Sequence, residues 1–214
     1  MCPLCAAEDL YQLATIDSKT YWQCNVCQLT FLSAKHHLPP EAELARYQLH
    51  ENSPEDHHYR KFLKRLTDHF VPHLSPGAEG LDYGSGPGPT LSVMLEEHGF
   101  RMNIYDPYFA PNTDALERTY DFITCTETVE HFYNPGVEFQ RLDGLLRHGG
   151  WLGVMTEMLV SDENFAEWWY HREPTHVCFY KQATMAWIAT QYDWEVVYPQ
   201  RNVTLFHKPI QPLV

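Results

Sequence analysis

Four cysteines near the start of the chain form two closely spaced pairs, Cys2 with Cys5 and Cys24 with Cys27. Both pairs have the C-x2-C spacing, which can bring four thiolates into a tetrahedron around Zn²⁺. Because sulfur would fill every position, the ion would be structural. It would also supply folding energy that so short a segment cannot obtain from its own core. The spacing therefore predicts a small zinc ribbon over residues 1–35, with disulfides or free thiols as the alternative.

A second group of residues suited to chemistry is the glycine-rich stretch "GLDYGSGPGPT", which follows an apolar run. Gly84, Gly86 and Gly88 permit positive φ and let backbone N–H groups approach a ligand closely. Such a turn after a strand predicts a site for a nucleotide-like cofactor. A dinucleotide fingerprint requires a third glycine where this chain has Pro89, which counts against a nicotinamide cofactor.

Asp106 lies about 20 residues beyond the glycines, at the end of the next predicted strand. A carboxylate at this place can accept hydrogen bonds from the ribose hydroxyls of an adenosine. The alternative for Asp106 is a turn residue before Pro107.

The elements that must position these residues alternate from residue 56 onward. We predict helices over 56–74, 90–99, 134–150 and 181–193, and strands over 79–84, 100–106, 119–126, 151–158, 194–199 and 202–208. This alternation predicts a Rossmann-like α/β fold, in which helices cover both faces of a mostly parallel sheet. The short turn before the last strand makes that strand antiparallel. The predicted organisation is a zinc-ribbon-like module over 1–35, a linker over 36–55 and the α/β domain over 56–214.

Four segments in this order, "LDYGSGPG", "YDP", "YDFITCTETVEHFYNP" and "LLRHGGWLGVMTE", resemble the class I S-adenosylmethionine-dependent methyltransferases of type 11/23. The resemblance covers about residues 56–208 and implies that the cofactor is S-adenosylmethionine. It implies contacts to the cofactor from Tyr59, Asp82, Gly84, Ser85, Gly86, Gly88, Asp106, Pro107, Thr126 and Glu127. The chain departs from the family between Asp106 and Tyr120, where the interval is too short for a helix and a full third strand.

Two histidines are the candidate catalytic residues. Methyl transfer from a sulfonium is an in-line displacement, and an acceptor hydroxyl or acidic carbon needs a general base. A neutral histidine suits that role near neutral pH. The resemblance places His131, after the strand over 119–126, and His176, after the strand over 151–158, near the acceptor. The alternative for each is a structural hydrogen bond.

Charge and composition limit the partners. The net charge of −13 and the lack of a local basic cluster make nucleic acid an unlikely partner. No apolar run is long enough to span a membrane, and the N-terminus does not read as a signal peptide, so we expect a cytoplasmic protein. The resemblance makes a small-molecule acceptor the main expectation. The alternatives are a cofactor-binding or zinc-ribbon interaction protein without turnover and, less favoured, an NAD-dependent oxidoreductase.

Overall fold

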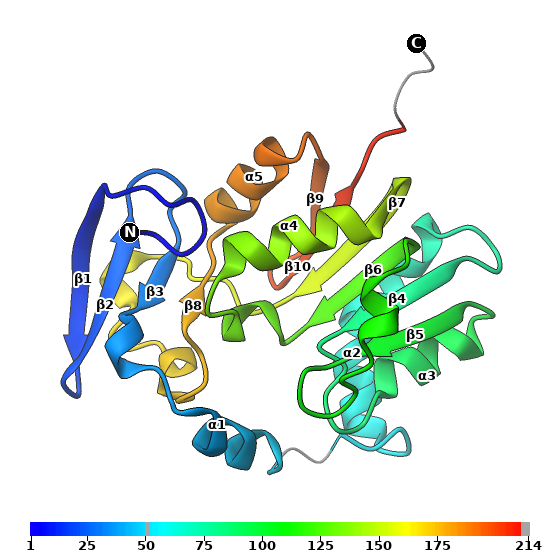
Figure 1. The fold of residues 1–214 in the computed structure, drawn as a ribbon, viewed down its shortest axis with the longest axis horizontal. Coiled ribbons are helices and arrows are strands. Elements are labelled where there is room, and N and C mark those ends of the chain that lie inside the picture. Colours follow the sequence, from blue (N-terminus) through cyan, green and yellow to red (C-terminus); the bar gives the residue numbers. More distant parts are fainter. Residues whose placement is uncertain (50–51, 211–214) are drawn as a thin grey trace.

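Six strands form the main sheet of the molecule, which a computed structural model describes over residues 1–49 and 52–210 (Figure 1). The strands lie in the order β5-β4-β6-β7-β10-β9. Their bounds are β4 Glu79–Tyr83, β5 Arg101–Tyr105, β6 Tyr120–Thr126, β7 Leu146–Met155, β9 Glu195–Gln200 and β10 Val203–His207. Strands β5, β4, β6 and β7 pair in parallel, whereas β10 runs antiparallel to both β7 and β9. The predicted mostly parallel sheet with an antiparallel last strand is confirmed.

Helices cover both faces of this sheet, also as predicted (Figure 1). Their bounds are α2 His57–Phe70, α3 Thr90–Glu97, α4 Pro135–Leu145 and α5 Gln182–Gln191. Neighbouring residues of a strand point to opposite faces, and β6 shows the result. Phe122 is buried with side chains of α2 and α3, while Ile123 is buried with side chains of α4 and α5.

The start of α2 follows from its sequence. The Asp56 carboxylate accepts hydrogen bonds from the backbone N–H groups of His58, at 2.8 Å, and Tyr59, at 3.4 Å. An aspartate at this position satisfies N–H groups that have no partner within the helix. Leu63, Leu66 and Phe70 then recur on one face and are buried. This packing fixes the helix against the sheet and places Tyr59 in its first turn.

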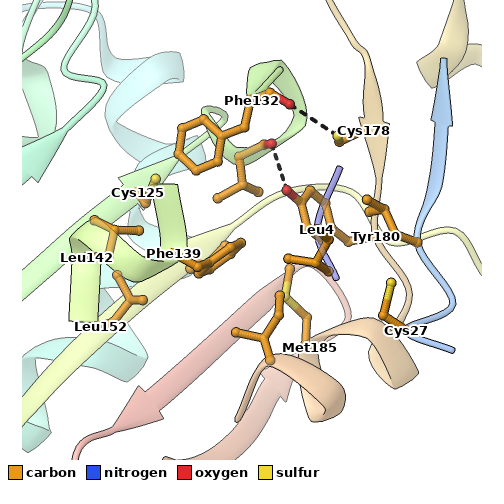
Figure 2. Close-up of a cluster of buried hydrophobic side chains, with 14 of the residues drawn as sticks. Leu4, Cys27, Cys125, Phe132, Phe139, Leu142, Leu152, Cys178, Tyr180 and Met185 are labelled. Atoms are coloured by element: carbon orange, nitrogen blue, oxygen red, sulfur yellow. Dashed lines mark hydrogen bonds between the residues drawn. The ribbon is translucent and has the colours of Figure 1, made fainter. Parts of the chain in front are cut away.

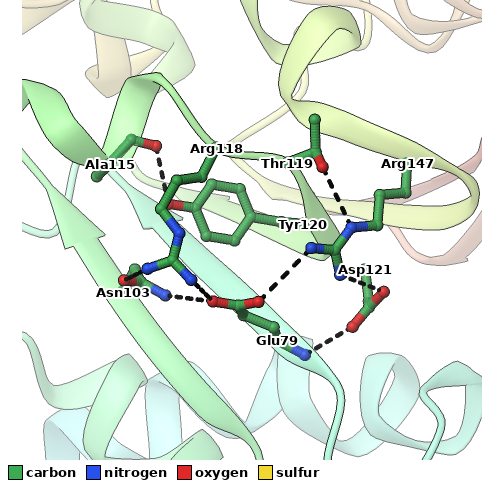
Figure 3. Close-up of polar contacts among 8 residues, drawn as sticks. All are labelled: Glu79, Asn103, Ala115, Arg118, Thr119, Tyr120, Asp121 and Arg147. Atoms are coloured by element: carbon green, nitrogen blue, oxygen red, sulfur yellow. Dashed lines mark hydrogen bonds and ion pairs between the residues drawn. The ribbon is translucent and has the colours of Figure 1, made fainter.

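The interval after β5 contains only a 3-10 turn, Thr113–Leu116, and β5 is an edge strand. The expected reduction of the third-strand unit is therefore confirmed. Charged groups join the strands at the end of the sheet where β4 and β6 begin (Figure 3). Asp121 accepts hydrogen bonds from the Glu79 backbone N–H and the Arg147 guanidinium, both at 2.8 Å, and Arg118 pairs with the Glu79 carboxylate.

The N-terminal segment contributes three strands to a second sheet, and a strand from much later in the chain completes it. The order is β1-β2-β3-β8, with every pair antiparallel. Its strands are β1 Leu10–Ile16, β2 Lys19–Cys24, β3 Thr30–Leu32 and β8 Cys178–Phe179. Leu4 and Cys27 share a buried cluster with Phe139 of α4 and Met185 of α5 (Figure 2). The N-terminal strands therefore pack directly on the α/β part.

One helix, α1 (Pro40–Tyr47), lies between the two sheets along the chain, within the predicted linker 36–55. Residues 50–51 of that linker and residues 211–214 of the predicted domain 56–214 lie outside the described residues. The boundaries 1–35, 36–55 and 56–214 remain a prediction. No helix among the described residues is both long and apolar enough to cross a membrane.

The helix predicted over 134–150 is shorter in the structure, because it ends at Leu145 and β7 begins at Leu146. Gly149 has a φ of +81° and donates its N–H to the Lys208 carbonyl at 2.7 Å. The Lys208 N–H in turn bonds to the Gly150 carbonyl at 2.9 Å. These two bonds pair Gly149 and Gly150 with the chain just after β10 and hold them in the strand. Local periodicity in the sequence cannot predict such a pairing.

Candidate functional site

A cavity of about 690 Å³ opens at the carboxyl ends of β4, β5 and β6, where open α/β sheets bind their ligands. The chain segments after these strands line it, together with parts of α1, α2 and the segment before β8. Most of the residues predicted for the site meet there: Tyr59, Gly84, Ser85, Gly86, Asp106, Pro107, Thr126, Glu127, His131 and His176. Asp82 and Gly88, also predicted, are not among the lining residues.

The glycine turn forms the floor of this cavity beside β5. Gly84 has a φ of +83° and Gly86 a φ of +65°, conformations that favour glycine. A Cβ at Gly84 would lie 2.2 Å from the Thr128 side chain, so the turn needs a glycine to approach the loop after β6. The Ser85 hydroxyl is buried and has no hydrogen-bond partner among the described residues. Ser85 thus offers an unpaired polar group within the cavity lining.

Gly88 serves packing instead. A Cβ at Gly88 would lie 1.7 Å from the backbone oxygen of Asn52. Only glycine therefore allows the segment before α2 to pack this closely on the turn. The Thr90 hydroxyl donates to the same Asn52 oxygen at 3.2 Å. Gly88 therefore supports the turn from outside the cavity.

Asp106 is a turn residue in the structure, which is one of the two interpretations that the sequence left open, and the contact to a ribose stays a prediction. Its Oδ1 accepts hydrogen bonds from the N–H groups of Tyr108, at 2.9 Å, and Phe109, at 3.0 Å, which makes it a turn residue. Its Oδ2 accepts the Gly86 N–H at 3.0 Å and so ties the turn after β5 to the glycine turn. A carboxylate oxygen has two acceptor positions, so Oδ2 keeps one for a ligand in the cavity.

Asp82 lies in β4, buried before the glycine turn. The hydroxyls of Thr124, at 2.8 Å, and Ser92, at 3.2 Å, donate to its carboxylate. Burial outweighs these two bonds and raises the pKa of Asp82 to about 6. Its position gives it a part in joining β4, β6 and α3.

Replacing Asp82 by asparagine is expected to change how stability depends on pH. The folded-state pKa exceeds the unfolded value, so folding favours the protonated carboxyl, and this contribution is lost as pH rises toward about 6. Relative to wild type, Asp82→Asn should gain on the order of 1 kcal/mol in unfolding free energy between about pH 5 and about pH 8. Urea unfolding at both pH values measures this difference. Equal pH dependence in the two proteins would contradict the assignment.

His131 and His176 are neighbours in the cavity lining. Their rings meet edge to face, with centroids 4.9 Å apart. The Nδ1 of His131 bonds to the Thr175 carbonyl at 3.0 Å, and the Nδ1 of His176 bonds to the Tyr170 carbonyl at 2.8 Å. Because a carbonyl oxygen only accepts, each Nδ1 is the donor, and each neutral ring carries its lone pair on Nε2. Burial lowers the pKa of His176 to about 4, so this ring is neutral at physiological pH.

Two glutamates line the same side of the cavity. Glu130 is fully buried, and its carboxylate accepts hydrogen bonds from the hydroxyls of Tyr170, at 2.5 Å, and Thr156, at 3.0 Å. Glu127 has a φ of +48°, a strained conformation for this residue type. Its Oε1 is buried without a partner among the described residues. Burial and the nearby charge of Glu130 raise the pKa of Glu127 well above its usual range.

Helix α1 supplies a wall of the cavity that the sequence did not predict. Glu43 is buried and accepts hydrogen bonds from the hydroxyls of Tyr47, at 2.9 Å, and Tyr108, at 2.7 Å. Arg46 forms two hydrogen bonds to the Glu173 carboxylate, at 2.8 and 2.6 Å. Glu43 thus attaches α1 to the turn after β5, and Arg46 attaches it to the segment that carries His176. The sequence of the linker, residues 36–55, indicates only one or two helical turns.

The four cysteine sulfurs of the N-terminal segment gather in one cluster. The Sγ atoms of Cys2 and Cys27 are 3.5 Å apart, as are those of Cys5 and Cys24, and all four lie within 4.8 Å of one another. These separations exceed a disulfide bond, whose length is about 2.05 Å. Four sulfurs bound to one zinc at about 2.3 Å would lie about 3.8 Å apart, so the cluster fits such an ion.

The sequence profile of the methyltransferase domain matches residues 56–198, about two thirds of the chain. The chain belongs to this methyltransferase family. The match confirms the prediction of a methyltransferase and covers every strand-end segment that lines the cavity. Helix α1 and the cysteine cluster lie before the matched region. A search of curated protein sequences finds no match.

Solved structures similar to this methyltransferase share its fold. An O-methyltransferase family protein from Burkholderia thailandensis has 13% identity and a TM-score of 0.55, and the match covers 72% of this chain and 57% of that one. The 1,6-didemethyltoxoflavin-N1-methyltransferase from the same organism has 15% identity and a TM-score of 0.51, with 85% and 96% covered. A putative sarcosine dimethylglycine methyltransferase from Galdieria sulphuraria has 12% identity and a TM-score of 0.51, with 74% of each chain covered.

Proposed function

We propose that this methyltransferase binds S-adenosylmethionine in the 690 Å³ cavity and methylates a small-molecule acceptor there. The observation that carries the proposal is the meeting of the glycine turn, Asp106 and the two histidines in one cavity. The groups present fit this cofactor. Gly84, Ser85 and Gly86 offer close backbone approach and an unpaired hydroxyl for its methionine part. Asp106 offers an acceptor position for its ribose.

S-adenosylmethionine, when bound, supplies an electrophilic methyl group and its own leaving group. The protein must then hold the acceptor in line, exclude water and take up the acceptor's proton. The lone pair on Nε2 of His131 or His176 can take that proton, because each Nδ1 is already occupied by a backbone carbonyl. The lowered pKa of His176 keeps it in the neutral, accepting form.

Four features favour a small acceptor. The cavity volume lies within the usual range for small-molecule sites, about 300–1,000 Å³. Helix α1 also covers part of it, through the bonds of Glu43 and of the Arg46–Glu173 pair. The structure of the similar 1,6-didemethyltoxoflavin-N1-methyltransferase holds 1,6-didemethyltoxoflavin and S-adenosylhomocysteine. The net charge of −13 disfavours a nucleic-acid acceptor.

We further propose that Cys2, Cys5, Cys24 and Cys27 bind a structural zinc ion. The supporting observation is the cluster of four sulfurs at separations close to those of a zinc tetrahedron. Thiolates at all four positions leave none for a reacting group. The ion would hold the loops from which β1 and β3 begin, and so secure the sheet that includes β8.

Isothermal titration of the purified chain tests the proposed cofactor. We expect S-adenosylmethionine to bind in the micromolar range and NAD not to bind, because Pro89 replaces the glycine of a dinucleotide turn. S-adenosylhomocysteine formation with candidate acceptors then measures turnover. Failure to bind S-adenosylmethionine, or binding of NAD instead, would contradict the proposal.

A further inference from the structure

We propose that Glu130, His131 and His176 bind a divalent transition-metal ion in the cavity, apart from the zinc at the cysteines. One ligand atom from each of the three residues lies within 4.8 Å of the other two. We call this set the histidine–glutamate centre. Two imidazoles and one carboxylate on one side of an open cavity suit Mn²⁺, Fe²⁺ or Zn²⁺ and leave positions free for another ligand.

The hydrogen bonds of the two histidines are compatible with metal binding. Metal-binding histidines usually donate their second ring N–H to a carbonyl or carboxylate, which fixes the ring and its tautomer. Here the Nδ1 atoms of His131 and His176 donate to the carbonyls of Thr175 and Tyr170. This leaves both Nε2 lone pairs for an ion.

Glu130 is held in the manner of a ligand as well. Ligating carboxylates are themselves hydrogen-bonded, and the hydroxyls of Tyr170 and Thr156 each bond to one Glu130 oxygen. Tyr170 holds two of the proposed ligands, Glu130 through its hydroxyl and His176 through its carbonyl. Each Glu130 oxygen retains an acceptor position, because an ionised carboxylate has about four.

The buried Glu130 carboxylate has no cationic side chain beside it among the described residues. Glu130 is fully buried, and the Oε1 of Glu127, in the same cavity, is buried without a hydrogen-bond partner among the described residues. Among those residues, no lysine or arginine forms an ion pair with either glutamate. Buried carboxylates without a cationic partner are unfavourable. A divalent ion at the centre would balance the charge of Glu130.

Small side-chain movements would bring the three ligand atoms to bonding distance from one ion. Ligands at about 2.1 Å from one ion lie at most about 4.2 Å apart, and the three ligand atoms lie within 4.8 Å of one another. The role of the ion rests on the proposed function. An acceptor hydroxyl bound to the ion would release its proton to water more readily, since the cation stabilises the oxyanion. His131 and His176 would then be ligands, and their role as a base would belong to the metal-free centre.

Titration of the full chain, loaded with one zinc per chain for the thiolates and freed of excess zinc, with Mn²⁺, followed by electron paramagnetic resonance, tests the proposal. Mn²⁺ prefers oxygen and nitrogen ligands, so it should not displace zinc from the thiolates. We expect about one Mn²⁺ per chain. Glu130→Gln and His131→Gln should each weaken binding by at least about 100-fold, and Tyr170→Phe by about 10-fold or more. His148→Gln, which changes an exposed histidine outside the cavity, is the matched control and should bind as wild type does.

Melting temperature and S-adenosylmethionine affinity are measured on the same samples. Retention of both by a variant that has lost Mn²⁺ assigns the loss to the metal site and not to misfolding. Absence of Mn²⁺ binding at millimolar concentration, or equal binding by His131→Gln and wild type, would overturn the proposal. Loss of S-adenosylmethionine binding in wild type would instead overturn the proposed function and leave the metal result standing.

Discussion

Replacing Asp106 by alanine is expected to weaken S-adenosylmethionine binding by about 100-fold or more. A hydrogen bond to a charged group contributes about 1.5–3 kcal/mol, and the proposal gives this carboxylate the ribose hydroxyls. The variant also loses the bond from the Gly86 N–H to Oδ2, which ties the glycine turn to the end of β5. Both effects act on the same ligand, so Asp106→Ala should have the largest effect on cofactor affinity of any single side chain.

Two further variants separate the cofactor contact from the turn. Asp106→Asn retains an oxygen for the N–H groups of Tyr108 and Phe109 but loses the charge that faces the cavity. We expect about a tenfold weakening for this variant. Asp114→Ala changes an exposed aspartate shortly after the same turn and should leave affinity unchanged. Isothermal titration measures all three. Wild-type affinity in Asp106→Ala would remove this residue from the proposed site.

The sequence predicted the parts of the site that local patterns encode. A glycine turn after a strand, an acidic residue at the next strand end and the segment after β6 all lie at carboxyl ends of parallel strands. The topology brings such ends together. The same argument did not distinguish Asp82 and Gly88 from the lining residues. Whether a residue beside the turn faces the cavity depends on packing, as the Cβ position of Gly88 against Asn52 shows.

These local patterns could not predict contacts between segments that are distant in the sequence. Helix α1 belongs to a polar, proline-interrupted segment, and nothing local indicates that Glu43 bonds to Tyr108, 65 residues later. Pairing of β3 with β8 joins residues about 150 positions apart, and β8 has only the two residues Cys178 and Phe179. So short a strand has no periodicity of its own. Its partner across the sheet defines it.

This pairing links the cysteine cluster to the site. The Leu32 N–H donates to the Val177 carbonyl at 2.8 Å, and Val177 directly follows His176. The Val177 N–H donates to the Glu130 carbonyl at 2.9 Å. The segment that carries His176 is therefore held between the second sheet on one side and the loop after β6 on the other. An ion that stabilises the second sheet would also stabilise the position of His176.

Replacing Cys24 by serine is expected to abolish zinc binding, from about one ion per chain to none. A structural zinc contributes roughly 10–16 kcal/mol in zinc-finger peptides, so its loss should unfold the N-terminal strands and lower the melting temperature markedly. Elemental analysis and thermal denaturation measure the two effects. Cys178→Ser is the matched control: this cysteine is buried in the same sheet, its sulfur donates to the Phe132 carbonyl at 3.2 Å, and serine can do the same. It should retain zinc.

The position of His176 gives this experiment a second readout. If the second sheet holds the segment before β8, Cys24→Ser should make that segment more mobile. Trp168 and Trp169 lie in it shortly before His176, so tryptophan fluorescence should change. S-adenosylmethionine affinity should change less, because the glycine turn and Asp106 directly follow β4 and β5, which lie away from the second sheet (Figure 1). Full zinc content in Cys24→Ser would refute the metal site. Loss of zinc with unchanged stability would show instead that the ion does not support the sheet.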